Sequence, residues 1–77
     1  MDDQPIETSL KVHRARRNLT QAELAELAGI TRVSVNAIEG GRMTPSILLS
    51  LKLAEALDVL VDELFWLRGS RRERADP

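Results

Sequence analysis

The chain of 77 residues has no cysteine, no tyrosine, one histidine, one phenylalanine and one tryptophan. Without cysteine it forms neither a disulfide framework nor a thiol nucleophile. A zinc site made of histidine and cysteine ligands is also excluded, because such a site needs several of these residues. His13, with neither a second histidine nor a nucleophile to work with, is expected to be a packed side chain or one at the rim of the core. We therefore expect no metal, no cofactor and no enzymatic activity.

Long hydrophobic runs are also missing. No apolar stretch approaches the roughly 20 residues that a membrane-spanning helix needs. The first residues, MDDQPIETS, are acidic and polar, unlike the basic and apolar start of a signal peptide. These features favour a cytoplasmic protein with no membrane partner. The short length predicts a single small domain of marginal stability.

An excess of positive charge is absent too, since the net charge is −1. Taken alone, this value argues against a nucleic-acid binder, because such proteins often carry a basic excess. The charges are segregated, however. Residues 10–42 hold six lysines and arginines against three glutamates, whereas acidic residues gather in 2–7 and 55–63. A segregated sequence can present one basic face.

The residues that are present predict an all-α fold of five helices, and no segment shows the alternation of a strand. The expected helices begin at Thr8 or Ser9, Thr20, Thr31, Ser46 and Val61, and end near Arg17, Gly29, Glu39, Leu57 and Leu67. TQAE is a capping box at the start of the second helix. We expect residues 1–5 to be a disordered lead, 6–68 to form the domain, and 69–77 to be a charged, disordered tail.

Apolar residues at helical spacing predict the core. The expected stripes are Leu24, Ala25, Leu27 and Ala28; Ile30, Val35 and Ile38; and Ile47, Leu51, Ala54 and Leu57, with Phe65 closing the core. Asn18 lies where the chain needs a left-handed residue, which asparagine tolerates better than most.

The opposite face of the third helix carries Arg32, Val33, Asn36, Ala37 and Gly40. A plain solvated surface is the default interpretation of such a face. Its chemistry nevertheless suits the edges of DNA bases. Arginine can donate twice to guanine, asparagine can pair twice with adenine, and valine can pack on a thymine methyl group. Small residues at 37 and 40 would let the helix sit deep in the groove.

The surrounding pattern is that of a helix-turn-helix at about residues 20–39. Seven positions carry the small, apolar or glycine residues that this motif requires: Leu24, Ala25, Ala28, Gly29, Ile30, Val35 and Ile38. Ala25 must be small where the two helices cross, and Gly29 must adopt a positive φ in the tight turn.

Residues 10–65 resemble the Cro/lambda-repressor-like (Xre-family) helix-turn-helix domains, which are compact five-helix DNA-binding proteins. The blocks LTQAELA, GITR, NAIExGR, PS and LKLAEAL carry the resemblance. It implies that Thr31, Arg32, Val33, Asn36 and Ala37 face the bases in the major groove, with Ser34 beside them. It implies that Gln21, Ser34, Gly40, Arg42 and Thr44 contact phosphates. It also implies an ion pair between Arg14 and Glu39.

The sequence departs from the family pattern at several positions. Val33 replaces a common polar reader and Gly40 a common asparagine, so the exact operator does not follow from the resemblance. Leu48 and Leu60 occupy positions that are usually polar. Together with Trp66 and Leu67 they are expected to form an exposed apolar interface.

Together these features predict a sequence-specific, double-stranded DNA-binding transcriptional regulator. We expect a repressor that binds a palindromic operator as a homodimer, since one recognition helix reads only a few base pairs. The alternative is an antitoxin or other protein-interaction module with the same fold, which would use the apolar interface to bind a protein partner.

Overall fold

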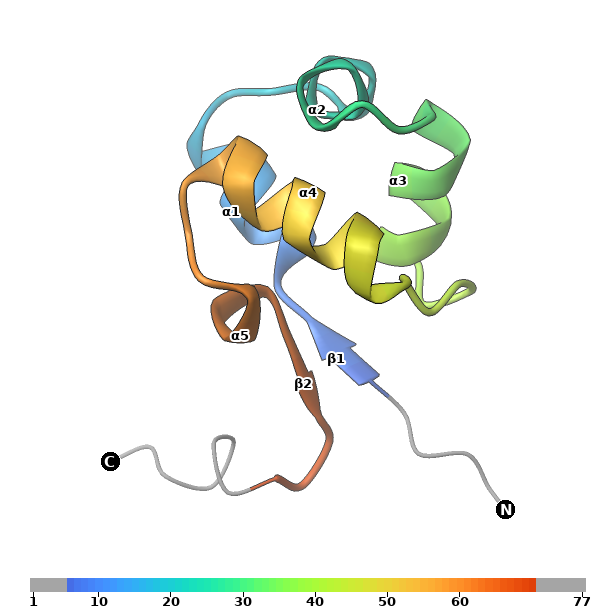
Figure 1. Cartoon of the computed structure of the whole chain (residues 1–77), viewed down its shortest axis with the longest axis vertical. Helices are drawn as coiled ribbons and strands as arrows, with labels where there is room; N and C mark the ends of the chain where they lie inside the picture. Colours follow the sequence, from blue (N-terminus) through green and yellow to red (C-terminus); the bar gives the residue numbers. More distant parts are fainter. Residues whose placement is uncertain (1–5, 71–77) are drawn as a thin grey trace.

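The computed structural model describes residues 6–70, in which five helices and two short strands form one layered unit (Figure 1). The elements are β1 (Ile6–Thr8), α1 (Leu10–Arg16), α2 (Gln21–Ala28), α3 (Arg32–Glu39), α4 (Ile47–Leu57), α5 (Val61–Leu64) and β2 (Phe65–Leu67). The predicted lead at 1–5 and residues 71–77 of the predicted tail lie outside the described residues.

Side-chain caps fix the starts of the three central helices. The Thr20 hydroxyl accepts from the Glu23 amide at 3.0 Å, and the Glu23 carboxylate accepts from the Thr20 amide at 2.8 Å. Thr31 accepts from the Ser34 amide at 3.0 Å, and Ser46 caps α4 in the same way. These caps satisfy backbone amides that have no partner within their helix, so the starts of α2, α3 and α4 agree with the prediction.

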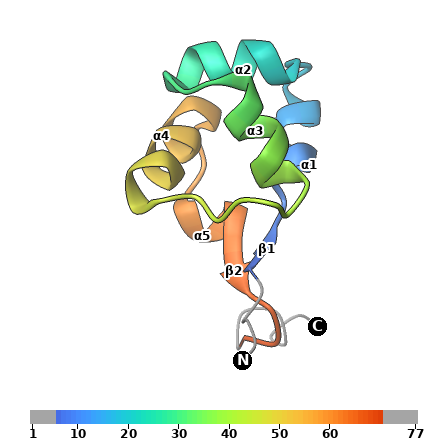
Figure 2. The ribbon, with the colours of Figure 1, turned by 90° about the vertical axis from the view of Figure 1, so that its right-hand side faces the viewer.

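The core lies between α2, α3 and α4, with α1 beside α3 and α5 below α4 in the view of Figure 2. Its buried residues are Leu10, Leu24, Ala25, Ala28, Val35, Ile38, Leu53, Ala54, Leu57 and Leu64. Burial of each large apolar side chain contributes about 1.5–3 kcal/mol of transfer free energy, so these few residues hold α3 in place.

The predicted apolar stripe of α4 is wrong in part. Ile47 is 81% exposed and Leu51 is 53% exposed, whereas Leu53, Ala54 and Leu57 are buried. The reason is that ILLSLKLAEAL is apolar on most of its circumference, so spacing alone does not choose the buried face. Leu27 of α2, also expected in the core, is 61% exposed.

The expectation of a purely helical fold is also corrected. β1 and β2 form an antiparallel pair in which Ile6 lies opposite Leu67 and Thr8 opposite Phe65. Helix α5 accordingly ends at Leu64 rather than at Leu67. Strands of three residues are too short to show alternation, and their pairing joins segments from opposite ends of the sequence.

The same region shows which residue completes the core. Leu64 is fully buried, while Phe65, which the sequence placed there, is only partly buried against the core. The Ser9 hydroxyl donates to the Glu63 carbonyl at 2.7 Å, and the Ser9 amide donates to the Leu64 carbonyl at 3.0 Å. Ser9 therefore joins the start of α1 to α5 instead of capping its own helix with its side chain.

Candidate nucleic-acid interface

Helix α3 presents two chemically different faces. Val35 and Ile38 are buried against the core. Arg32, Val33 and Asn36 are exposed, and Val33 keeps 70% of its surface open. The helix is only eight residues long, so its position depends on the packing of its buried face. The exposed face is left available for a partner; Ala37 is half-buried at its edge.

The tight turn between α2 and α3 fixes the direction of α3. Gly29 has φ 74° and ends α2, and the Ile30 amide donates back to the Ala25 carbonyl at 3.0 Å. Ala25 is 4% exposed in the packed region between α2 and its neighbours. The short turn and the small side chain set the geometry that a helix-turn-helix requires.

The structure brings Arg14 and Glu39 together in a bidentate ion pair. Arg14 Nε lies 2.6 Å from Glu39 Oε2, and Nη2 lies 3.1 Å from Oε1. The side chains are only 15% and 5% exposed, and Nη1 of Arg14 also donates to the Leu19 carbonyl at 2.8 Å. The pair joins α1 to the last residue of α3.

The ion pair shifts both ionisation equilibria toward the charged forms. Burial acts to raise the pKa of Glu39, but hydrogen bonds from Arg14 and Gln21 and the positive charge of Arg14 outweigh it, so this pKa lies below its ordinary value. The hydrogen bond to Glu39 raises the pKa of Arg14. Both groups therefore stay ionised at neutral pH.

A line of hydrogen bonds continues from this pair to the exposed face of α3. Gln21 Nε2 donates to Glu39 Oε1 at 3.0 Å, and Asn36 Nδ2 donates to Gln21 Oε1 at 3.3 Å. Arg42 Nη2 donates to Asn36 Oδ1 at 2.5 Å. We call the residues Glu39, Gln21, Asn36 and Arg42 the polar relay. The polar relay was not predicted from the sequence, because its members come from α2, from α3 and from the segment after α3.

The other predicted DNA-contacting residues lie in the first turn of α3 or in the segments on either side of it. Thr31 accepts from the Ser34 amide, and the two hydroxyl oxygens lie 3.0 Å apart, so both residues are engaged at the start of the helix. Gly40 follows the end of the helix with an ordinary φ of −85°. Thr44 is exposed in the segment that leads to α4. The predicted base-reading and phosphate-contacting residues thus belong to α3, to the residues on either side of it as far as Thr44, and to the start of α2.

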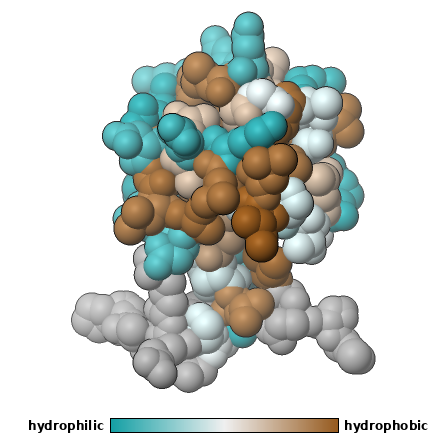
Figure 3. Space-filling view, in the orientation of Figure 1, coloured by the Kyte–Doolittle hydropathy of each residue, from teal (hydrophilic) through white to brown (hydrophobic). Residues whose placement is uncertain are grey.

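The four residues predicted to form an apolar interface differ in exposure. Leu48, Leu60 and Leu67 are 60%, 68% and 53% exposed, whereas Trp66 is half-buried in β2. Ile47 and Leu51, displaced from the expected core, join the exposed set. Figure 3 shows hydrophobic residues gathered over α4 and the segment that follows it. We call Ile47, Leu48, Leu51 and Leu60 the apolar surface.

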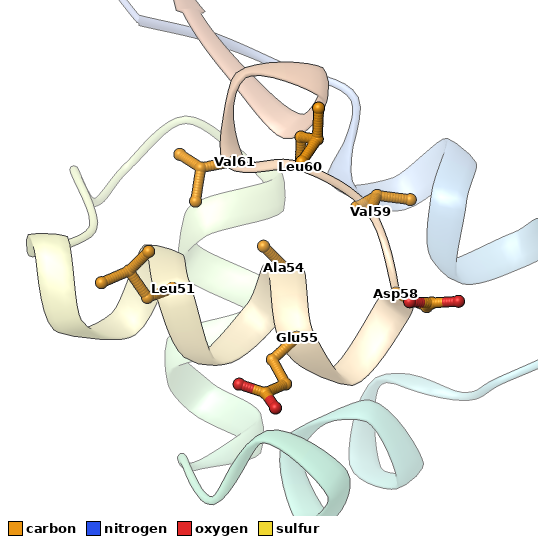
Figure 4. Close-up of a pocket in the computed structure, with 7 residues that line it drawn as sticks. All are labelled: Leu51, Ala54, Glu55, Asp58, Val59, Leu60 and Val61. Carbon is orange, nitrogen blue, oxygen red and sulfur yellow. The ribbon is translucent and has the colours of Figure 1, made fainter.

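A shallow cleft of about 400 Å³ lies beside the apolar surface. Its lining comes from α4 and from the turn into α5, as Figure 4 shows for Leu51, Ala54, Glu55, Asp58, Val59, Leu60 and Val61. Within residues 6–70 no group of histidine and carboxylate side chains is arranged to hold a metal ion. No helix in that same range is long and apolar enough to cross a membrane.

A family model described as helix-turn-helix matches residues 10–64. The chain belongs to this helix-turn-helix family. The predicted family is thereby confirmed. The matched segment runs from the start of α1 to the end of α5, so it includes the two-helix motif, the ion pair and the polar relay.

Several relatives of this helix-turn-helix protein span nearly the same length. The regulator YgzD of Bacillus subtilis, named as an uncharacterized HTH-type transcriptional regulator, is 40% identical over 62 residues, covering 80% of this chain and 94% of its own. An archaeal protein with the same description, from Methanocaldococcus jannaschii, is 38% identical over 60 residues, covering 78% and 91%.

Solved structures of two other proteins have a similar fold. The restriction-modification controller protein C.AhdI from Aeromonas hydrophila is 39% identical, with a TM-score of 0.68 over 70% of this chain and 82% of its own. The clp gene regulator ClgR from C. glutamicum is 30% identical, with a TM-score of 0.65 over 70% of each chain.

Proposed function

We propose that this helix-turn-helix protein is a sequence-specific, double-stranded DNA-binding transcriptional regulator. The observation that carries the proposal is the exposed face of α3, where Arg32 and Asn36 stand out on a helix whose other face is buried. The family and the regulators among its relatives support the same function. We further propose a cytoplasmic repressor, located on the nucleoid when bound, which acts by occupying promoter DNA and has no enzymatic activity.

Arg32 and Asn36 are the proposed principal base readers. A guanidinium can donate two parallel hydrogen bonds to guanine, and a carboxamide can both donate to and accept from adenine. Thr31, Val33 and Ala37 complete the reading face. The exposed Val33 side chain is suited to the methyl group of thymine, which gives this protein an apolar contact where its family often has a polar one.

Phosphate contacts are proposed for residues at the start of α2, in the first turn of α3 and in the segment that follows α3: Gln21, Ser34, Gly40, Arg42 and Thr44. Contacts of this kind position a protein on the duplex without reading its sequence. They also make the affinity fall as salt rises, because each neutralised phosphate releases counterions.

A homodimer is proposed because one recognition helix reads only a few base pairs. A two-fold pair of α3 helices would read a palindrome with half-sites about 34 Å apart. We place the interface on the apolar surface, extended by Leu67 and the accessible part of Trp66. Exposed leucines beside a shallow cleft can bury one another across a two-fold axis, which removes apolar area from water.

The test is selection from a random duplex library by the wild type and by an Arg32→Ala, Asn36→Ala double variant. Both changed residues are exposed, so the variant is expected to fold, which circular dichroism checks. We expect the wild type to enrich a palindrome and the double variant to lose that enrichment. Each lost base contact should cost about 1–3 kcal/mol of discrimination. Equal enrichment by both proteins would disprove reading through α3.

A second candidate function is an antitoxin or other protein-binding module. The observation that favours it is the same apolar surface, since large exposed hydrophobic patches mark interfaces of many kinds. A wild-type protein that selects no duplex at moderate salt but copurifies with a toxin encoded by a neighbouring gene would favour this function over the first.

A further inference from the structure

Arg42 is folded back against the last turn of α3. The Arg42 amide donates to the Ala37 carbonyl at 2.9 Å, and the Gly41 amide donates to the Ile38 carbonyl at 3.1 Å. Gly41 has φ 76°, so the chain reverses there in the arrangement of a Schellman motif. This reversal directs the Arg42 side chain toward Asn36, whose Oδ1 accepts from Nη2.

Gly40 provides the space that the guanidinium occupies. A β-carbon at position 40 would lie 3.2 Å from Arg42 Cζ and closer still to Nη1. The backbone of Gly40 does not itself demand glycine, because its φ is −85° and it lies in the right-handed helical region. The absence of a side chain at this position leaves room for the Arg42 guanidinium, which a β-carbon would displace from its present place beside Asn36.

The two charged ends of the polar relay fix the orientation of the Asn36 amide. The Glu39 carboxylate only accepts hydrogen bonds, so Gln21 turns its nitrogen toward it and its oxygen toward Asn36. The Arg42 guanidinium only donates, so it faces the Asn36 oxygen. The hydrogen bond to Gln21 uses one N–H of the Asn36 amide, and the hydrogen bond from Arg42 uses one lone pair of its oxygen. One donor and one acceptor stay free, which is the set that adenine requires.

We propose that Arg42, seated above Gly40, is a specificity-determining residue that acts by orienting Asn36. The inference rests on the proposed function and adds to the phosphate contact proposed for Arg42. A phosphate contact alone predicts that Arg42→Ala weakens every duplex equally. The contact with Asn36 predicts that Arg42→Ala reduces the affinity unequally. The loss of discrimination should be greatest at the base that Asn36 reads.

The experiment compares Gly40→Ala, Arg42→Ala and the charge control Lys52→Ala, which removes a positive charge from the exposed side of α4. Affinities are measured for the selected palindrome and for duplexes changed at one position at a time, at several salt concentrations. The position read by Asn36 is identified beforehand with Asn36→Ala.

We expect Gly40→Ala and Arg42→Ala each to reduce discrimination at that one position by about tenfold. Arg42→Ala should also lower the salt slope by about one, and Gly40→Ala, which keeps the charge, should lower it less. Lys52→Ala should leave discrimination unchanged. The double variant Gly40→Ala, Arg42→Ala should discriminate no worse than Arg42→Ala, because both changes break the same contact.

A readout on the free protein separates this inference from the proposed function. The side-chain amide resonances of Asn36 should shift in Gly40→Ala and in Arg42→Ala, and stay in place in Lys52→Ala. If the wild type selects no duplex, the proposed function fails, and this inference fails with it. If selection occurs but Arg42→Ala weakens all duplexes alike, or the Asn36 resonances do not move, only the role of Arg42 is overturned.

Discussion

Among single residues, Arg14 and Glu39 are those whose substitution should clearly lower the free energy of unfolding. Each residue is partly buried, and each side chain neutralises the charge of the other. Arg14→Ala would leave the partly buried Glu39 carboxylate without its positive partner, which should cost about 3 kcal/mol, at the low end for a buried pair broken from one side. Urea unfolding followed by circular dichroism measures this loss. Arg68→Ala, at the more exposed pair that Arg68 forms with Glu7, is the control and should cost about 0–1 kcal/mol.

The ion pair between Arg14 and Glu39 should also make the free energy of unfolding depend on pH in acid. Because the folded state lowers the pKa of Glu39 from its ordinary value of 4.5, the ionised carboxylate stabilises the fold above that pH. The contribution is lost as the pH falls through the lower, folded-state value. The free energy of unfolding of the wild type should therefore decline more steeply in acid than that of Glu39→Gln. Parallel pH curves for the two proteins would contradict this account.

The sequence predicts the burial or backbone conformation of a single residue well where a local pattern determines it. Val35 and Ile38 are buried and Asn36 is exposed because the period of one short helix separates them. Asn18 adopts φ 57°, as its position after a helix indicated. The polar relay lies beyond such reasoning, since no local pattern records that Gln21 and Arg42 meet at Asn36.

Among the elements, the turn between α2 and α3 should be sensitive to substitution of its glycine. Gly29 has φ 74°, and a β-carbon there would meet no atom within 4 Å. The cost of Gly29→Ala is then backbone strain rather than collision, about 1–2 kcal/mol. Thermal or urea unfolding measures it. Gly29→Asn should lose less stability, because asparagine tolerates the left-handed region better; equal losses would show that strain is not the cause.

The starts of the three central helices could be predicted more reliably than helix faces or strands. Thr20, Thr31 and Ser46 mark their helix starts through chemistry that acts within three residues. The buried face of α4 depends on what packs against it, and an almost uniformly apolar helix leaves that choice to tertiary structure. The β1–β2 pair depends on two segments that only the completed fold brings together.

At the scale of the whole molecule, the apolar surface should control assembly. Leu60→Lys places a charge on a side chain that is 68% exposed, so the fold should persist while the proposed dimer dissociates. Sedimentation velocity over a range of concentrations measures the change. Leu27→Lys is a matched control, because Leu27 is 61% exposed but lies on α2. A wild type that sediments as a monomer throughout, or a Leu60→Lys variant that stays dimeric, would refute this interface.

The short sheet also determines how the domain responds to tension. Ile6 at the outer end of β1 lies opposite Leu67 at the outer end of β2, so both ends of the domain emerge side by side (Figure 1). A pull that separates them acts across the strands and loads one pair at a time. The strand pairs would separate in order, from Ile6–Leu67 to Thr8–Phe65, before the helices were pulled apart. The three strand pairs therefore stand between such a pull and helix α3.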